Sequence, residues 1–365
     1  MIVGIDIRAA CGQKAGIGTH FYELVHNVAK VDLTNTYYLY CREPFEFRED
    51  LPNNIRIIRL NVPLLLWHPM VSLHARLRHV KAFLTSSNIT ALFLRRNQLI
   101  LHIPDMSGIV LKNFHTYKVI ALSKLYHFVA RKARFINTTS SFSREEIALN
   151  LKVNRDKIFV TALATSPAFR RIDDRRELDH WKKSLTLPPR FILFVGSIEP
   201  RKNIMGILNA LLRMDLKSRP TLVIAGGHGW KNSDVFNYVK KYKLGDNVCI
   251  LGYVSREALV ALYNLAEVFI FPSFYEGFGL PVLEAFACGT PVIASNVSSI
   301  PEVAGDAALL IDPHNVEEIA NAISKVLQDP VLRDQMVHKG AAQLKNFSWE
   351  KNAIETVSIF NRIKD

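Results

Sequence analysis

Two carboxylates, Glu276 and Glu284, flank a glycine-rich turn in the segment FYEGFGLPVLEAFACGTPVIAS, residues 274–295. Gly277 and Gly279 lie in this turn, and a helix is predicted to begin directly after it. The N-terminus of a helix offers unpaired backbone N–H groups and the positive end of the helix dipole, which together suit a phosphate. Carboxylates accept hydrogen bonds from sugar hydroxyls. The segment therefore predicts a site for a sugar that carries a phosphate.

Two cations are predicted to lie at the same edge of the same sheet. Arg201 and Lys202 follow the predicted strand 191–195, and Glu276 follows the predicted strand 268–271. A guanidinium and an ammonium group at that edge would neutralise a diphosphate leaving group. Taken one at a time, the carboxylates and the cations also fit ordinary solvated positions. Their convergence at the strand ends of one sheet favours a binding site.

Strands alternate with amphipathic helical patterns along the chain, which is typical of parallel sheets with crossover helices. Two segments, 1–30 and 191–212, open alike with a β-branched strand, a glycine-containing loop and a helix. The predicted fold class is therefore α/β, with two doubly wound, Rossmann-like domains whose ligands bind at the carboxyl ends of the strands. The predicted strands are residues 1–7, 55–60, 91–94, 99–103, 136–139, 158–161, 191–195, 221–225, 248–251, 268–271 and 291–294.

The charged run RRIDDRREL and the pair Pro188-Pro189 mark a break between the two domains. A helical pattern follows Ser348, which suits an N-cap, and this helix either completes the second domain or packs back on the first. The predicted parts are a first Rossmann-like domain at 1–168, a linker at 169–189, a second Rossmann-like domain at 190–348 and a final helix at 349–365.

The positive charge is unevenly divided. Residues 1–185 hold 28 Lys and Arg against 15 Asp and Glu, so the whole net charge of +13 lies in this half. This excess indicates an anionic partner, which is a membrane surface, a pyrophosphate-linked acceptor or nucleic acid, although an incidentally basic half also fits the count. No apolar run approaches the roughly 20 residues that span a bilayer, and the N-terminus does not resemble a signal peptide. The four cysteines form no CxxC pair and are typical of reduced thiols in a cytosolic protein.

The segment VPLLLWHPMVSLHARLRHVKAFL, residues 62–84, carries the strongest membrane signal. An apolar run ending at Trp67 leads into a helical pattern in which Arg76, Arg78 and Lys81 alternate with large apolar residues. Basic amphipathic helices that contain an aromatic residue lie on anionic membranes. A core helix with one solvated basic face fits the same pattern.

The segment 274–295 resembles the Glu-x7-Glu motif of the retaining glycosyltransferases of family 4, including the Gly-Thr-Pro-Val that follows it. The resemblance extends over nearly the whole chain. It implies the GT-B architecture, in which two Rossmann-like domains face each other across a cleft and the last helix returns to the first, acceptor-binding domain. The other matching segments are Gly16-Ile-Gly18-Thr-His20, Ser140-Ser141-Phe142-Ser143, Val195-Gly196-Ser197-Ile-Glu199-Pro-Arg201-Lys202-Asn203, Gly252-Tyr253-Val254-Ser255 and Phe347-Ser348-Trp349.

The resemblance implies roles for these residues. Glu276 would hold hydroxyls of the transferred sugar, and Glu284 would bind the ribose of the nucleotide. Arg201 and Lys202 would bind the diphosphate, with Ser197 at a position where some members have an arginine. The remaining donor-binding candidates are Gly277, Phe278, Gly279 and Leu280 at the sugar and phosphates, Tyr253 and Val254 at the nucleobase, and Gly16 and Gly18 in the loop that closes over the diphosphate.

The chain departs from the family at the end of one strand of the first domain. Many members carry a His-Asp pair there, and its histidine touches the donor sugar, but this chain has Pro104-Asp105. Asp105 remains a catalytic candidate. Either His102, two residues earlier, replaces the missing histidine imperfectly, or this chain does not touch the donor sugar at that point. His102 and His20 are the candidates for contact with the acceptor.

These features predict a retaining hexosyltransferase. It would move a hexose, with mannose from GDP-mannose as first choice, from a nucleoside-diphosphate sugar to a hydroxyl of a lipid-linked or growing glycan. The choice of mannose rests on Glu-Pro-Arg-Lys-Asn, which resembles mannosyltransferases of bacterial polysaccharide assembly. The leaving diphosphate would take the acceptor proton on the face from which the acceptor attacks.

No cofactor and no metal are expected. The chain has neither an Asp-x-Asp pair nor a histidine cluster, and its glycine-rich loop lacks the third glycine of the dinucleotide fingerprint. No nucleic-acid-binding module is recognisable. We expect a cytoplasmic protein that lies peripherally on the inner face of the cytoplasmic membrane, an anionic surface. The alternatives are a GT-B nucleotide-sugar epimerase or phosphorylase, or a catalytically inactive scaffold subunit.

Overall fold

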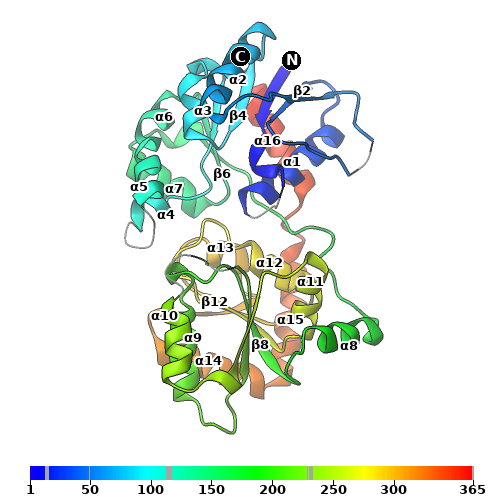
Figure 1. Cartoon of the computed structure of the whole chain (residues 1–365), viewed down its shortest axis with the longest axis vertical. Helices are drawn as coiled ribbons and strands as arrows, with labels where there is room; N and C mark the ends of the chain where they lie inside the picture. The colour runs from blue at the N-terminus through cyan, green and yellow to red at the C-terminus, as the bar shows by residue number, and fades with distance from the viewer. Residues whose placement is uncertain (13–15, 49, 112–116, 228, 230–232, 364–365) are drawn as a thin grey trace. The chain divides into compact units, whose positions relative to one another are not determined.

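The protein forms two compact units in a computed structural model, which describes residues 1–12, 16–48, 50–111, 117–227, 229 and 233–363. The first unit comprises Met1–Ala164 together with Phe347–Asp365, and the second comprises Thr165–Asn346. Each unit contains one parallel sheet with helices on its faces (Figure 1). The predicted α/β class with two doubly wound, Rossmann-like domains is therefore confirmed.

The sheet of the first unit has the strand order β3-β2-β1-β4-β5-β6-β7, and all of its neighbouring strands are parallel. Its strands are β1 (Ile2–Asp6), β2 (Thr36–Cys41), β3 (Ile55–Arg59), β4 (Ala82–Thr85), β5 (Leu99–His102), β6 (Phe135–Thr138) and β7 (Ile158–Val160). Its helices are α1 (Ile17–Val31), α2 (Leu64–Leu77), α3 (Asn88–Phe93), α4 (Ser107–Val110), α5 (Tyr117–Lys124), α6 (Tyr126–Lys132), α7 (Ser141–Leu151) and α16 (Trp349–Asn361).

The sheet of the second unit has the order β10-β9-β8-β11-β12-β13 and is also parallel throughout. Its strands are β8 (Phe191–Val195), β9 (Thr221–Ala225), β10 (Val248–Gly252), β11 (Val268–Phe271), β12 (Val292–Ser295) and β13 (Ala308–Ile311). Its helices are α8 (Arg175–Ser184), α9 (Ile204–Arg213), α10 (Ser233–Lys241), α11 (Arg256–Leu265), α12 (Leu280–Ala287), α13 (Ile300–Ala304), α14 (Val316–Gln328) and α15 (Pro330–Leu344).

In both sheets the earliest strand lies in the middle, and the strand order reverses beside it. The reversal falls between β1 and β4 in the first unit and between β8 and β11 in the second. Loops leave the two flanking strands in opposite directions at such a point, which opens a crevice at the carboxyl edge of the sheet. These two crevices are where each unit is expected to bind ligands.

Two predicted segments have a different structure from the one predicted, and β2, β4 and β13 lie where no strand was predicted. Residues 91–93 belong to helix α3, and Leu94 follows its end, so no strand forms there. The Ser87 side chain caps this helix by accepting a hydrogen bond from the Thr90 N–H at 3.2 Å. The predicted linker 169–189 contains helix α8, which Asp174 caps and which packs on α11 within the second unit. The charged run, residues 170–178, thus leads into the first turn of this helix.

Helix α2 turns its aromatic residue inward. The segment predicted to carry the membrane signal, 62–84, is divided between α2 and the buried strand β4, and Trp67 is fully buried under the guanidinium of Arg8, 4.0 Å from the ring centroid. The expectation that Trp67 anchors a membrane surface is therefore wrong. No helix in the described parts of the chain is long and apolar enough to cross a membrane.

The final helix belongs to the first unit. Ser348 caps α16 by accepting a hydrogen bond from the Lys351 N–H at 3.1 Å, as the sequence predicts. The helix lies beside α1 (Figure 1), and the amide of Asn352 donates to the carbonyl oxygens of Thr161 and Ala162 at 3.2 and 2.9 Å. Phe360 is fully buried in the same core cluster as Phe21 of α1. These contacts explain why the chain ends on its first unit.

His20 and His102 lie together in this core. Their rings are 4.6 Å apart, His20 stacks on Trp349 of α16 at 6.0 Å, and their exposed fractions are 1% and 0%. His102 Nδ1 lies 2.7 Å from Asn137 Oδ1. An acceptor could reach either ring only if the core around α16 opened, so this placement does not support the predicted acceptor-side contacts.

Burial of these histidines predicts acid sensitivity of the first unit. Burial lowers the pKa of His102 from 6.5 to about 4, against the raising effects of Asn137 and Asp105, and it also lowers the pKa of His20. The unfolded chain then takes up protons first as the pH falls, so the stabilisation is complete above pH 6.5 and is lost between pH 6.5 and 4. For His102 alone the loss at pH 5 is about 2 kcal/mol.

The expected loss can be measured by urea-dependent hydrogen exchange at the amides of α1 and α16, at pH 7.5 and pH 5. His102→Gln retains a partner for Asn137 but does not titrate, so it should reduce the difference in unfolding free energy between the two pH values. The exposed His180 provides the matched control, because His180→Gln should leave that difference unchanged. Equal reductions in both variants would contradict the assignment.

Candidate active site

The predicted phosphate-binding residues lie at the carboxyl edge of the second sheet. Arg201 and Lys202 follow β8 in a short 3-10 helix, Pro200–Lys202, and Glu276 follows β11. Because β8 and β11 are neighbours at the point where the strand order reverses, the two loops meet over one crevice. A backbone hydrogen bond of 2.9 Å from the Phe274 N–H to the Arg201 carbonyl oxygen joins them.

Local sequence explains the shape of the first loop. Gly196 and Gly226 leave their strands at φ values of +146° and +152°, and a Cβ on Gly226 would lie 2.0 Å from the Gly196 carbonyl oxygen. Only glycine permits this close approach. Pro200 opens the 3-10 helix, and Asn203 closes it in the left-handed conformation while its side chain caps α9. Arg201 and Lys202 are thereby held over the crevice.

A buried ion cluster brings together three of the four charges predicted from the sequence. Glu276 Oε1 lies 2.7 Å from Lys202 Nζ, and its Oε2 lies 3.0 Å from Arg201 Nη1. Arg201 also donates to the Tyr275 carbonyl oxygen at 2.6 Å and to Glu199 Oε1 at 2.7 Å. Glu276 and Lys202 are 7% and 8% exposed. The cluster therefore pairs two cations with two carboxylates.

The cluster sets the ionisation of its members. Burial by itself would raise the pKa of Glu276, but Arg201 and Lys202 beside it lower the pKa to about 2. Burial lowers the pKa of Lys202, while the attraction of Glu276 opposes that change. Ionised partners inside a protein strengthen one another because the local dielectric is low. The site therefore holds a carboxylate that is ionised throughout the physiological range.

Two serines fix the turn that follows Glu276. The Glu276 N–H donates to Ser298 Oγ at 3.0 Å, and Ser299 Oγ lies 2.9 and 2.8 Å from the carbonyl oxygens of Glu276 and Phe278. Gly279 follows at φ +109°, where a Cβ would lie 2.6 Å from Ile300 Cδ1. Helix α12 begins at the next residue, so its N-terminal N–H groups face the same crevice edge as predicted.

Glu284 lies within α12, apart from the ion cluster in its bonding. Its Oε2 accepts a hydrogen bond from the buried hydroxyl of Tyr263 at 2.9 Å. Burial raises the pKa of Glu284 to about 7, although Tyr263 and Arg256 act in the opposite direction. A carboxyl group with a pKa near neutrality changes its capacity to accept hydrogen bonds within the physiological range.

The other predicted donor-binding residues of this unit lie on its loops. Tyr253 is 70% exposed and, like Val254, follows Gly252, which ends β10 at φ +70°. Ser197 is half-buried in the loop after β8. Gly277, Phe278 and Gly279 directly precede α12, which begins at Leu280, and Phe278 is buried.

The first unit holds the remaining predicted residues. Gly16 precedes α1 and Gly18 lies in its first turn, whereas residues 13–15 of the same loop lie outside the described residues. Asp105 accepts a hydrogen bond from the Ser107 N–H at 2.8 Å and so stabilises the start of α4. This hydrogen bond gives Asp105 a structural role, and its catalytic role stays a prediction.

Sequence reasoning missed four residues that shape the site. Glu199 binds Arg201, Tyr263 binds Glu284, and Ser298 and Ser299 hold the turn after Glu276. Glu199 could have been found, because it immediately precedes Pro-Arg-Lys. The hydroxyl groups carry no distinctive pattern, and only the tertiary structure shows their partners.

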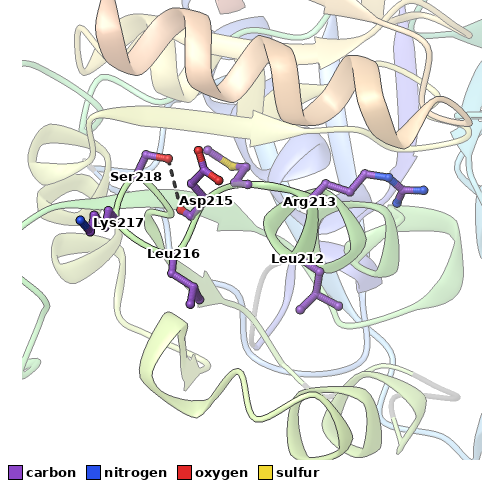
Figure 2. A pocket seen from close by; sticks show the side chains of 7 residues that line it. Leu212, Arg213, Asp215, Leu216, Lys217 and Ser218 are labelled. Atoms are coloured by element: carbon purple, nitrogen blue, oxygen red, sulfur yellow. Dashed lines mark hydrogen bonds between the residues drawn. The ribbon is translucent and has the colours of Figure 1, made fainter.

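A hollow in the same unit lies away from the ion cluster of Arg201, Lys202 and Glu276. It is lined by residues 212–218 of the loop between α9 and β9 (Figure 2). Because this loop leads into β9, it lies at the amino edge of the parallel sheet, opposite the edge that carries Lys202. Among the described residues no group of three His, Cys, Asp or Glu side chains could hold a metal ion.

Known proteins that are similar to this chain are glycosyltransferases. Residues 175–343 match the family model described as glycosyl transferases group 1. The chain is 38% identical over 259 residues to O-antigen chain mannosyltransferase B of Escherichia coli, covering 70% of this chain and 68% of that protein. It is 32% identical over 252 residues to serotype-specific mannosyltransferase WbdA of E. coli, covering 68% of this chain and 31% of that protein.

Among solved structures, sucrose-phosphate synthase from Thermosynechococcus elongatus matches with a TM-score of 0.78 at 21% identity, covering 100% of this chain and 98% of that one. At this identity the match shows the fold, and it is the GT-B fold implied by the resemblance. The chain belongs to the group 1 glycosyl transferases and is a hexosyltransferase. It spans about a third of the length of WbdA.

The ion cluster predicts a large effect of neutralising Glu276. Glu276→Gln keeps the shape of the side chain but leaves Lys202 and Arg201 without their shared carboxylate. We expect kcat/KM for release of nucleoside diphosphate from the donor to fall at least tenfold, about 1.4 kcal/mol of transition-state stabilisation. Glu267→Gln is the matched control, because Glu267 pairs with Arg190 at the amino edge of the same sheet. Full activity of the Glu276 variant would show that the site is misassigned.

The raised pKa of Glu284 predicts pH-dependent nucleotide binding. Ribose hydroxyls donate to a carboxylate, and a pKa of about 7 leaves most Glu284 side chains protonated at pH 6 and ionised at pH 8. The affinity for GDP should therefore rise by about tenfold from pH 6 to pH 8, as measured by titration calorimetry. Glu284→Gln should bind more weakly and lose this increase. The phosphate groups of GDP titrate equally in experiments with Glu284→Gln and with the unaltered protein. The same dependence of GDP affinity on pH in both proteins would therefore contradict the role of Glu284.

Proposed function

We propose that this hexosyltransferase transfers mannose from GDP-mannose, with retention of configuration, to a hydroxyl of a growing or lipid-linked glycan. The observation that carries the proposal is the buried cluster of Arg201, Lys202 and Glu276 at the point where the strand order of the second sheet reverses. The choice of mannose is supported by the names of the two E. coli relatives, both of which are mannosyltransferases.

The geometry supports a mechanism in which the diphosphate enters the ion cluster. Lys202 and Arg201 already face one carboxylate, so phosphate oxygens of the donor can replace Glu276 as the partner of both cations. Glu276 is then released to accept hydrogen bonds from hydroxyls of the sugar. Charge stabilisation prepared in this way acts on the leaving group as its negative charge develops.

Retention follows if the acceptor attacks from the side of the departing diphosphate. The bond between C1 of mannose and the phosphate oxygen breaks, and a bond forms between C1 and the acceptor oxygen. The acceptor proton passes to the leaving phosphate oxygen, so no protein nucleophile and no metal ion is required. In this scheme the protein positions the reactants and stabilises charge.

A panel of nucleotide sugars offered with mannose-terminated acceptors, with and without EDTA, tests this proposal. Mass spectrometry should find GDP-mannose consumed and one hexose added to the acceptor, and NMR should find an α-linkage, with equal rates in EDTA. Consumption of the donor without a glycan product would instead indicate an epimerase or phosphorylase. No consumption of any donor would indicate an inactive scaffold, and a β-linkage would contradict retention.

We further propose that the protein lies peripherally on the cytoplasmic face of an anionic membrane and that helix α2 makes the contact. The inner face of α2 is buried, but Leu65, Leu73 and Leu77 on its outer side are 86%, 48% and 66% exposed. Several large apolar side chains exposed along one helix mark an interaction surface. Phe93 of α3 is 49% exposed beside this helix, since the Ser72 hydroxyl donates to its carbonyl oxygen at 2.7 Å.

Basic residues surround this apolar ridge. Arg76, Arg78 and Lys81 are all exposed at the end of α2 and just beyond it, and Arg95 and Arg96 are exposed after α3. Each cation near an anionic surface contributes about 1 kcal/mol, and the contribution fades over a Debye length of about 8–10 Å. Apolar groups flanked by cations in this way fit an anionic lipid surface.

Sedimentation with phosphatidylglycerol vesicles separates the two contributions. Arg76→Glu, Arg78→Glu and Lys81→Glu together should abolish the part of binding that weakens with salt. Leu65→Ser, Leu73→Ser and Leu77→Ser should abolish the part that salt does not remove. The matched control reverses the exposed Lys240, Lys241 and Lys243 of the second unit, which should leave binding unchanged. Equal losses in the control, or no binding by the unaltered protein, would contradict the proposal.

A further inference from the structure

A second cluster of polar side chains lies at the carboxyl edge of the first sheet, where β1 and β4 are neighbours and the strand order reverses. Asp6 ends β1 and Thr85 ends β4, and Thr85 donates to Asp6 Oδ2 at 3.0 Å. Arg8 follows Asp6 by two residues and begins a short 3-10 helix, Arg8–Ala10. No prediction from the sequence included these residues.

Contacts from three elements hold the Arg8 side chain in one position. Its Nε and Nη2 donate to the two oxygens of Asp6 at 3.0 and 2.9 Å, and Nη2 also lies 3.3 Å from Thr90 Oγ1. The guanidinium stacks on the ring of Trp67, 4.0 Å from its centroid. His68 Nδ1 lies 2.9 Å from the same Thr90 hydroxyl. The guanidinium is thus fixed by α2, α3 and β1 together.

Arg8 is the member of this cluster that reaches solvent. Its side chain is 22% exposed, whereas that of Asp6 is 3% exposed and Thr85, Thr90 and Trp67 are fully buried. Among the described residues Nη1 has no hydrogen-bond partner. An arginine held on three sides, with one nitrogen open at the ligand-binding edge of a sheet, is prepared to bind a ligand.

The charge of the cluster favours a neutral ligand. Asp6 lies at contact distance from the guanidinium and would repel a phosphate that approached the same group. A sugar hydroxyl carries no charge and accepts a hydrogen bond from a guanidinium N–H. We infer that Arg8 binds a hydroxyl of the acceptor hexose, with Asp6, Thr90 and Trp67 as its positioning residues. This inference rests on the proposed function, in which the acceptor is a growing or lipid-linked glycan, here represented by a mannose disaccharide.

Steady-state kinetics with α-mannobiose as acceptor and GDP-mannose as donor test the inference in the full chain. Arg8→Lys keeps the charge but loses the planar group that stacks on Trp67 and binds Asp6 twice. We expect KM for α-mannobiose to rise at least tenfold, while hydrolysis of GDP-mannose without acceptor stays within twofold of the unaltered protein. Thr90→Val, which removes one hydrogen-bond partner of Arg8, should raise the same KM by a smaller factor.

Arg134→Lys is the matched control, because Arg134 is exposed, lies over the ring of Phe135 and precedes β6 at the amino edge of the same sheet. Arg134→Lys should change neither KM for α-mannobiose nor the hydrolysis of GDP-mannose. An unchanged KM for α-mannobiose in Arg8→Lys, or equal losses of transfer and hydrolysis, would overturn the inference, as would inhibition of the unaltered protein by phosphate that Arg8→Lys relieves.

A direct binding measurement separates this inference from the proposed function. NMR titration of the chain with α-mannobiose should show saturable binding that Arg8→Lys weakens and Arg134→Lys does not. If GDP-mannose is not consumed but this pattern is observed, the proposed reaction fails and the binding role of Arg8 stands. If α-mannobiose does not bind, or if both variants bind it equally well, the role of Arg8 is contradicted.

Discussion

The buried contact of Glu276 with Lys202 and Arg201 is the constraint on which the second unit depends. Removing such charges from water costs several kcal/mol per ion unless each finds a close partner. The loops after β8 and β11 must therefore close on each other, and the backbone bond between Phe274 and Arg201 shows that they do. Ser298 and Ser299 then fix the turn that leads into α12. The site is thus organised before any ligand enters it.

The two units use the same sheet geometry for different electrostatic purposes. In the second unit two cations share an ionised carboxylate, and oxygens of a diphosphate could take its place as their partner. In the first unit one cation, Arg8, is compensated by Asp6 and presents a single open edge. Both clusters lie where the strand order reverses, because loops diverge there and leave room for side chains.

The parts of the fold that rest on local pattern could be predicted from the sequence. Strands 191–195, 221–225 and 268–271 coincide with β8, β9 and β11, because each is a buried β-branched or aromatic run between polar turns. Elements of about four residues were harder to predict. Residues 91–93 form part of a helix, and β4 was not predicted within a segment that has a helical period, since four residues do not distinguish a period of 2 from one of 3.6. The contacts of Glu276 followed from strand order, but the burial of Trp67 and His102 depends on partners far away in the sequence.

In the proposed mechanism a diphosphate displaces Glu276 from Lys202 and Arg201. A crystal structure of the protein with bound GDP tests it most directly. We expect phosphate oxygens within hydrogen-bond distance of Lys202 Nζ and of the N–H groups at the start of α12, and a contact between Lys202 and Glu276 longer than its present 2.7 Å. GDP bound elsewhere, for example in the hollow at residues 212–218, with the ion cluster unchanged, would show that the diphosphate does not displace Glu276.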